Sequence, residues 1–311
     1  MPRKRTQAVL SAIALALSVA TGLPAQTRTL AERLGHPKDA KLLIIHADDL
    51  GVAHSVNSAS LDALDRGTIT SASIMMPTPW VAEVAAYARA HPAHDLGLHL
   101  VLTSEWKTYR WGPVSSTDDV PSLFDSTGTL PSEVETVVAR ARPEEVEQEL
   151  RAQVRRALAL GIRPTHLDSH MGALFAKPEL FAAYAKVAHE FRLPFLAPRA
   201  PAGVSMPGLT ERDVVVDNVV QASPTVTREG WKQYYLGLIK GLRPGLTELI
   251  VHLGHDDAEL QAVTVDHEPW GSAWRGRDTD VVNSAEFRKA LEDAGVVLVR
   301  WRDLQKLAYQ P

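Results

Sequence analysis

The sequence predicts an α/β fold in which about seven parallel strands form a (β/α) barrel. From Lys41 onward, short β-rich runs alternate with amphipathic helical patterns, which is typical of a parallel sheet wrapped by crossover helices. No Pro/Ser-rich linker and no 20–50-residue repeat interrupts the alternation. The chain of 311 residues suits one barrel with insertions, so we expect a single domain over residues 41–311.

Seven runs have the length and composition of buried strands, and six stretches between them have apolar residues at helical spacing. Glycines commonly follow the helical stretches, as C-caps do. The expected strands are 41–46, 71–76, 96–102, 165–168, 194–198, 248–253 and 296–301. The expected helices are 56–65, 81–90, 144–160, 179–191, 226–240 and 285–294.

Two longer segments, 103–142 and 255–284, do not fit this alternation. The first contains Trp106 and Trp111, and the second contains Trp270 and Trp274. Connections this long in a compact domain usually serve a function.

Composition and charge exclude several classes of protein. There are 33 Lys and Arg against 37 Asp and Glu, for a formal net charge of -4, which does not suggest a protein built to bind nucleic acid. The sequence has no cysteine, so disulfides, thiolate metal sites and a Cys nucleophile are excluded. A metal ion would have to be held by His and carboxylate ligands.

The amino terminus predicts export. A basic start, residues 2–5, precedes an apolar run from Ala8 to Leu23, which is typical of a secretory signal peptide. We expect residues 1–25 to be removed, leaving residues 26–40 as an extension before the domain. Cleavage after Ala25 would remove three basic residues and change the formal charge from -4 to -7. The alternative is an uncleaved membrane anchor. After cleavage, no stable insertion in a membrane is expected.

An acidic pair follows the first expected strand. Asp48 and Asp49 would point to opposite faces of a regular strand, so both can reach one site only if the chain turns there, which Gly51 permits. Two close carboxylates repel each other unless a metal or a proton lies between them. The alternative is an acidic turn on the surface.

Histidines occur at or near the ends of three further expected strands. These are His99, then His166 and His170 around Asp168, and finally His252. A single strand histidine is more often a hydrogen-bonded core residue, but a barrel brings the ends of its strands together at one pocket. Two imidazoles and one carboxylate leave positions open on Zn²⁺, and a free carboxylate and a further histidine can serve as base and acid. The pattern therefore predicts a catalytic metal site.

These residues lie in ordered motifs, and with them the sequence resembles the YdjC/ChbG family of carbohydrate deacetylases, distant relatives of the NodB-type polysaccharide deacetylases. The resemblance covers nearly all of the chain that follows the signal peptide. The motifs are 47–51 with Asn57, 67–73, 97–100, 165–170, 198–199, and 248–252 with Arg277 and Glu286 downstream.

The resemblance implies a deformed (β/α) barrel and a divalent-metal hydrolase that removes acetyl groups from N-acetylated sugars. It implies Asp49, His99 and His170 as metal ligands. It also implies Asp48 as the general base and His252 as the general acid.

Two supporting roles follow from the same resemblance. Arg199 would hold Asp48 ionised, and Asp168 would orient a histidine through its second ring nitrogen. His166 remains either a supporting residue or a ligand.

The sequence also departs from the family pattern. Residues 171–173 replace the further histidines of many members, and a signal peptide is unlike the cytoplasmic members. These departures weaken any transfer of substrate. Glu105, Trp106 and Trp111 are candidates for sugar binding, although the two tryptophans would equally serve to fix a long loop to the barrel.

Several questions stay open at this point. Zn²⁺ is the expected ion, with Mg²⁺, Mn²⁺ or Co²⁺ as alternatives. Two other functions remain, which are hydrolysis of a different amide or ester by a metal-dependent barrel, and carbohydrate binding without catalysis. The expected partner is an N-acetylated carbohydrate and no nucleic acid. The oligomeric state is open, and a homodimer is one alternative.

Overall fold

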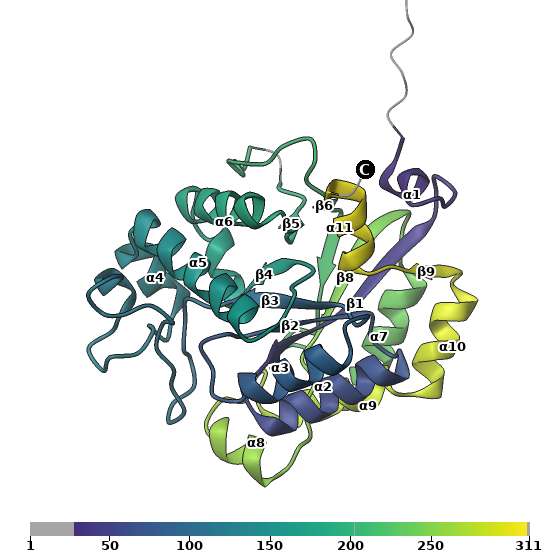
Figure 1. Ribbon diagram of the computed structural model, residues 1–311. Coiled ribbons are helices and arrows are strands. Elements are labelled where there is room, and N and C mark those ends of the chain that lie inside the picture. The colour runs from purple at the N-terminus through teal and green to yellow at the C-terminus, as the bar shows by residue number, and fades with distance from the viewer. Residues whose placement is uncertain (1–27, 202, 310–311) are drawn as a thin grey trace, which may run out of the picture.

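A parallel sheet of seven strands runs through the centre of the computed structural model, which describes residues 28–201 and 203–309 (Figure 1). The strand order is β4-β3-β2-β1-β8-β7, and β9 pairs with the first residues of β1. The predicted signal peptide lies outside the described residues. The strands of this sheet are β1 (Lys41–Leu50), β2 (Ser71–Ile74), β3 (Leu96–Leu100), β4 (Leu167–Ser169), β7 (Asn218–Val220), β8 (Gly245–Val251) and β9 (Val296–Leu298).

The central strand β1 is buried on both faces, because its first half is an unbroken apolar run. Leu43 and Ile45 face the main hydrophobic core beneath the helices. Leu42 and Ile44 face the opposite way, into the concave interior of the curled sheet, where they pack in a smaller cluster with Trp301. This alternation places every second residue of β1 in the interior.

Helices cover the outside of the sheet (Figure 1). Among these, α5 packs against α6 and β3, and α10 packs against α7 and β9. The helices are α1 (Leu30–Arg33), α2 (His54–Arg66), α3 (Val81–Ala90), α4 (Val134–Arg140), α5 (Pro143–Ala159), α6 (Pro178–Phe191), α7 (Trp231–Lys240), α8 (Ala258–Val263), α9 (Ser272–Val282), α10 (Ala285–Asp293) and α11 (Trp301–Tyr309), with short 3₁₀ helices η1 (Pro121–Leu123) and η2 (His170–Phe175).

One end of the interior is closed by α1 and α11. Ala31 of α1 and Leu304 of α11 pack with Leu42 and Leu246, which lie near the starts of β1 and β8. The carboxyl ends of the strands lie away from these two helices. In barrels of this class, the carboxyl ends of the strands carry the catalytic site. Within the described part of the chain, none of the helices has the length and hydropathy to cross a bilayer.

The predicted fold class, a deformed barrel of parallel strands and helices, is confirmed. All seven expected strand regions contain strands, but the one at 194–198 does not join the main sheet. There β5 (Ala197–Pro198) pairs with β6 (Val215–Val216) in a sheet of two strands. A single β-bridge from Leu167 to Phe195 connects this region to β4. Beyond β4, the wall of the barrel therefore consists of the short strands β5 and β6.

Among the elements that the sequence analysis missed are β7 and α9. The strand β7 has three residues and pairs with β8, which is too short a run to be identified by alternation. The helix α9 lies in the segment expected to be an irregular insertion. Its buried side includes Ser272, Arg275 and Asp278, and these polar residues hide the helical period.

Candidate metal centre

The end of β1 turns so that two consecutive carboxylates face one site. Asp48 continues the interior-facing alternation of the strand, whereas Asp49 has a φ of 66°, in the left-handed region. The pairing register with β2 shifts between Ala47 and Leu50, as in a β-bulge. The side chain of Asn57 then accepts a hydrogen bond of 2.6 Å from the backbone N–H of Gly51 and fixes the turn.

The three predicted metal ligands converge beside this turn. Oδ1 of Asp49 lies 3.3 Å from Nε2 of His99 and 3.3 Å from Nδ1 of His170, and the two nitrogens are 3.2 Å apart. Each side chain is buried yet retains a few per cent of its exposure. The ligand atoms therefore form a small triangle at the carboxyl ends of β1, β3 and β4.

The donor set fits a divalent cation. Two ligands that each lie about 2 Å from a tetrahedral Zn²⁺ are about 3.3 Å apart, which is the spacing of these three atoms. Oδ1 of Asp49 is buried and accepts no hydrogen bond from the residues that the structure describes. Asp48, Asp49 and His252 form a second candidate group that shares Asp49 with the first.

A carboxylate stands behind each of the two imidazoles. Oδ1 of Asp168 lies 2.7 Å from Nδ1 of His99, and Oε2 of Glu105 lies 2.9 Å from Nε2 of His170. Ligand histidines commonly donate their second ring N–H in this way, which fixes the tautomer and orients the ring. Glu105, a candidate for sugar binding, thus contacts a candidate ligand.

The charges around the triad favour a cation. Burial alone would lower the pKa of His170, but the carboxylates of Glu105 and Asp49 raise it to about 9. Burial would also lower the pKa of His99, yet Asp168 and Asp49 raise it well above its usual range. The carboxylates therefore stabilise positive charge at both rings.

Arg275 of α9 is the principal counter-charge of the acidic pair. Its Nη2 donates to Oδ2 of Asp49 at 2.7 Å, and its Nε donates to the carbonyl of Trp270 at 2.8 Å. Burial would raise the pKa of Asp49, but Arg275 and the two imidazoles hold it well below its usual range. The sequence analysis identified the segment that carries Arg275 but not the residue.

Arg199 does not take the position predicted for it beside Asp48. Its guanidinium is largely exposed and pairs with Asp217. The reason lies in the sheet: β5 leaves the main sheet, and the backbone of Arg199 bonds to Val216 of β6. The arginine that reaches the acidic pair is Arg275, which contacts Asp49 rather than Asp48.

Asp48 and His252 lie together on one side of the triangle. Oδ2 of Asp48 is 3.5 Å from Nε2 of His252. Burial, followed by the charge of Asp49, raises the pKa of Asp48 to about 7. Burial lowers the pKa of His252 to about 3. The backbone N–H of His252 donates to Asp278 at 3.0 Å, an anchor that the sequence analysis missed.

The two candidate tryptophans are almost completely buried, with exposures of 1% for Trp106 and 4% for Trp111. The indoles meet edge to face at 5.7 Å, and Nε1 of Trp111 donates to the carbonyl of Thr103. The guanidinium of Arg275 lies 5.7 Å from the Trp106 ring. These contacts fix the long 103–142 segment to the barrel and leave little aromatic surface for a sugar.

Comparisons with known proteins identify the family of this chain. A relative from Geobacillus stearothermophilus named carbohydrate deacetylase is 30% identical over 269 residues, 85% of this chain and 98% of the relative. A second protein of that name, from Thermus thermophilus, is 40% identical over 178 residues, which are 57% of this chain. The match spans 61% of that relative, which is less than two thirds of its length.

A solved structure from Enterococcus faecalis, described as a candidate cellobiose-phosphate cleavage protein, matches with a TM-score of 0.71 at 25% identity. The match covers 85% of this chain and 99% of that one. The sequence profile of the family described as YdjC-like protein matches residues 42–293, from the second residue of β1 to the end of α10. This chain therefore belongs to the YdjC-like protein family.

Proposed function

We propose that this protein is a metal-dependent deacetylase that hydrolyses the acetamido group of N-acetylated sugars. One observation carries the proposal: the donor atoms of Asp49, His99 and His170 converge at ligand spacing directly beside Asp48. Family membership and relatives named carbohydrate deacetylase support the same activity.

In this proposal, Asp49, His99 and His170 hold one divalent cation, and Zn²⁺ is favoured because two of the three ligands are imidazoles. When bound, the cation acts as a Lewis acid that polarises the acetyl carbonyl and acidifies water. Asp168, Glu105 and Arg275 fix the three ligand side chains in place.

Asp48 would remove the proton from the attacking water. Its pKa of about 7 is close to the ideal for a general base at neutral pH. Its Oδ1 is buried and free of hydrogen bonds within the described part of the chain, so it can accept a proton.

His252 would deliver that proton to the leaving amine. Because its own pKa is low, the ring is neutral at pH 7 and must first receive a proton. Asp48 lies 3.5 Å from its Nε2 and can supply it. The amide C–N bond then breaks, the amine leaves with the proton, and acetate is the second product.

Acetate release from a panel of N-acetylated mono- and oligosaccharides tests this function, with O-acetylated sugars and a simple acetamide as comparison substrates. We expect acetate only from N-acetylated sugars, and a rate of release lower by about 100-fold or more with Asp48→Asn. Turnover of an ester or a non-sugar amide alone would indicate a different hydrolase. Metal binding without any turnover would indicate a carbohydrate-binding protein.

We also propose that the protein acts outside the cytoplasm, because residues 1–25 have the pattern of a secretory signal peptide. Amino-terminal sequencing of the mature protein from a host cell tests this proposal. A new terminus near Ala25 in the exported fraction is expected, whereas a full-length chain in the cytoplasm would contradict it.

A further inference from the structure

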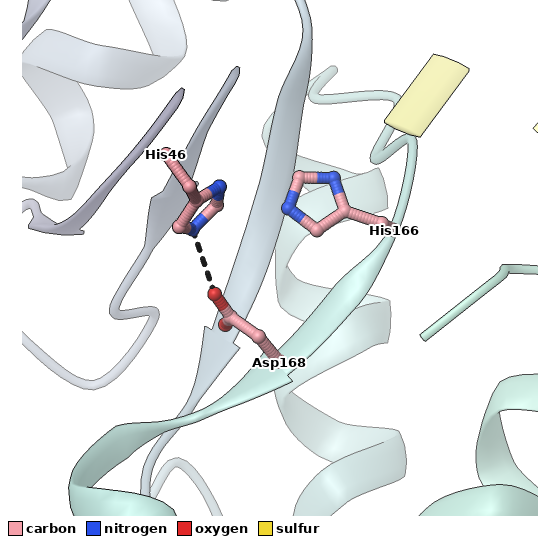
Figure 2. Close-up of side chains that lie close together, drawn as sticks. All are labelled: His46, His166 and Asp168. Carbon is pink, nitrogen blue, oxygen red and sulfur yellow. Dashed lines mark ion pairs between the residues drawn. The ribbon is translucent and has the colours of Figure 1, made fainter. Parts of the chain in front are cut away.

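A layer of polar side chains fills the barrel interior directly beneath the candidate metal centre. His46 enters from β1, Asp168 from β4, and His166 from the residue before β4 (Figure 2). The three side chains are almost fully buried. Branched apolar residues usually fill such interiors, and a buried polar layer is stable only if its groups satisfy one another.

Asp168 makes two hydrogen bonds and one ion pair in this layer, and Nε2 of His46 also lies 3.0 Å from the hydroxyl of Ser73. Its Oδ1 accepts from Nδ1 of His99 at 2.7 Å. Its Oδ2 accepts from the hydroxyl of Ser73 at 2.7 Å and lies 2.8 Å from Nε2 of His46, the ion pair drawn in Figure 2. The carboxylate is therefore fixed from both sides.

The bond to His99 determines where that ring carries its proton. A carboxylate only accepts hydrogen bonds, so Nδ1 of His99 bears a proton, and in the neutral ring Nε2 presents the lone pair. Nε2 is the atom that lies 3.3 Å from Oδ1 of Asp49. The orientation of Asp168 thus decides whether His99 can act as a ligand.

We propose that His46 is a positioning residue, which holds Asp168 in the orientation that keeps His99 ready to bind a metal. The chain of contacts runs from Nε2 of His46 through both oxygens of Asp168 to the ring of His99. The proposal rests on the proposed function only in taking His99 as a metal ligand. His46 itself does not touch the ion or the substrate.

The other end of His46 is held as well. Its Nδ1 lies 3.2 Å from the hydroxyl of Ser71 and 3.7 Å from Oε1 of Glu248. Glu248 in turn accepts a hydrogen bond of 3.3 Å from the indole of Trp301. The ring of His46 is thus held from β2, β8 and α11, and rotation would break contacts on both sides.

His166 offers a matched control in the same layer. Its ring meets that of His46 edge to face at 5.1 Å and stacks on Trp301 at 5.2 Å. Its Nδ1 lies 3.0 Å from the hydroxyl of Thr165, and its Nε2 has no hydrogen-bond partner among the described residues. It is as buried as His46 but does not bond to Asp168.

The test compares His46→Leu, His46→Gln and His166→Leu in two measurements. The first is the ¹⁵N NMR tautomer of the His99 ring in the metal-free protein, assigned with His99→Gln and recorded at a pH at which the ring is neutral. The second is the Kd for Zn²⁺ from competition with a chelating dye. Neither measurement requires a sugar to be turned over, so a wrong substrate assignment would not affect them.

We expect His46→Leu to mix the two neutral tautomers of His99 and to weaken Zn²⁺ binding by about 10- to 100-fold. His46→Gln, whose amide N–H can replace Nε2–H, restores most of the affinity. His166→Leu lowers stability but leaves the tautomer and the Kd near those of the wild type.

Unchanged values in His46→Leu, or equal losses in His166→Leu, would overturn the proposal. A stoichiometry of two bound Zn²⁺ ions per wild-type chain and one per His166→Leu chain would also overturn it. His46, His166 and Asp168 would then be the ligands of a second ion. If His46→Leu does not fold, Ser73→Ala removes the other donor to Oδ2 and is expected to weaken binding by less than about tenfold. An unchanged His99 tautomer and an unchanged Kd for Zn²⁺ in Ser73→Ala would then contradict the proposal.

Discussion

Nη2 of Arg275 donates a hydrogen bond of 2.7 Å to Oδ2 of Asp49, and both side chains are buried. This pair connects α9 to the end of β1, and the two residues are 226 positions apart in the sequence. It leaves Oδ1 of Asp49 directed at His99 and His170. One oxygen of the carboxylate is thus held by the protein, and the other faces the candidate metal centre.

Arg275→Met is expected to lower the free energy of unfolding of the metal-free protein by about 3 kcal/mol, because it leaves a buried carboxylate without its partner. Urea unfolding with a chelator present measures this loss. Arg277→Met is the control, since Arg277 lies on the same helix with its guanidinium 4.6 Å from the Trp231 ring. That control should cost about 1 kcal/mol or less. Equal losses in the two variants would contradict the role of the ion pair.

Asp48→Asn is expected to retain the metal and to lower kcat by about 100-fold or more, because an amide cannot accept the proton. Metal content and steady-state kinetics on the best N-acetylated sugar measure the two effects. His252→Ala should also retain the metal and slow the reaction. Loss of metal from both variants would favour the alternative ligand group of Asp48, Asp49 and His252.

Glu105 distinguishes a role in holding His170 from a role in binding sugar. We expect Glu105→Gln to weaken metal binding by about tenfold and Glu105→Leu by about 100-fold, because the bond to Nε2 of His170 is first weakened and then lost. Metal titrations measure the affinity, and KM is then determined at saturating metal. An unchanged metal affinity with a raised KM would restore the sugar-binding interpretation.

Glu248 should make stability depend on pH. Burial raises its pKa to about 7, against the carboxyl's usual 4.5, so the fold favours the protonated form. Its contribution is present below pH 4.5 and is lost as the pH rises through 7. Urea unfolding at pH 4.5 and pH 7.5 should show the wild type losing about 3 kcal/mol more than Glu248→Gln, a shift of about 2.5 units at 1.36 kcal/mol each. The same pH dependence in both proteins would show that Glu248 is ionised in the fold.

The periodic parts of the fold could be predicted from the sequence. The apolar runs of β1, β3 and β8 and the regular helices α3, α5, α6 and α10 follow from local patterns. The short strands β6 and β7 could not be predicted, because two or three residues have no periodicity and depend on the strands they pair with. The place of β5 outside the main sheet likewise depends on tertiary pairing.

The candidate site divides in the same way. Asp48, Asp49, His99, His170 and His252 stand at strand ends, where sequence and fold class together indicate chemistry. Residues that hold the candidate ligands in place without binding the metal were harder to assign, because their partners are distant in the sequence. Arg275 is 226 positions from Asp49, and the sequence analysis assigned no role to His46, whose partner Asp168 lies on a different strand.

The most direct test of the central claim is a titration of the chelated protein with Zn²⁺, with acetate release from an N-acetylated sugar as the readout. The account predicts no release from the metal-free protein and full activity at one equivalent of Zn²⁺ per chain. It also predicts no recovery at that point for His99→Ala or His170→Ala. Full activity in the chelated protein, or recovery of both variants at one equivalent, would contradict it.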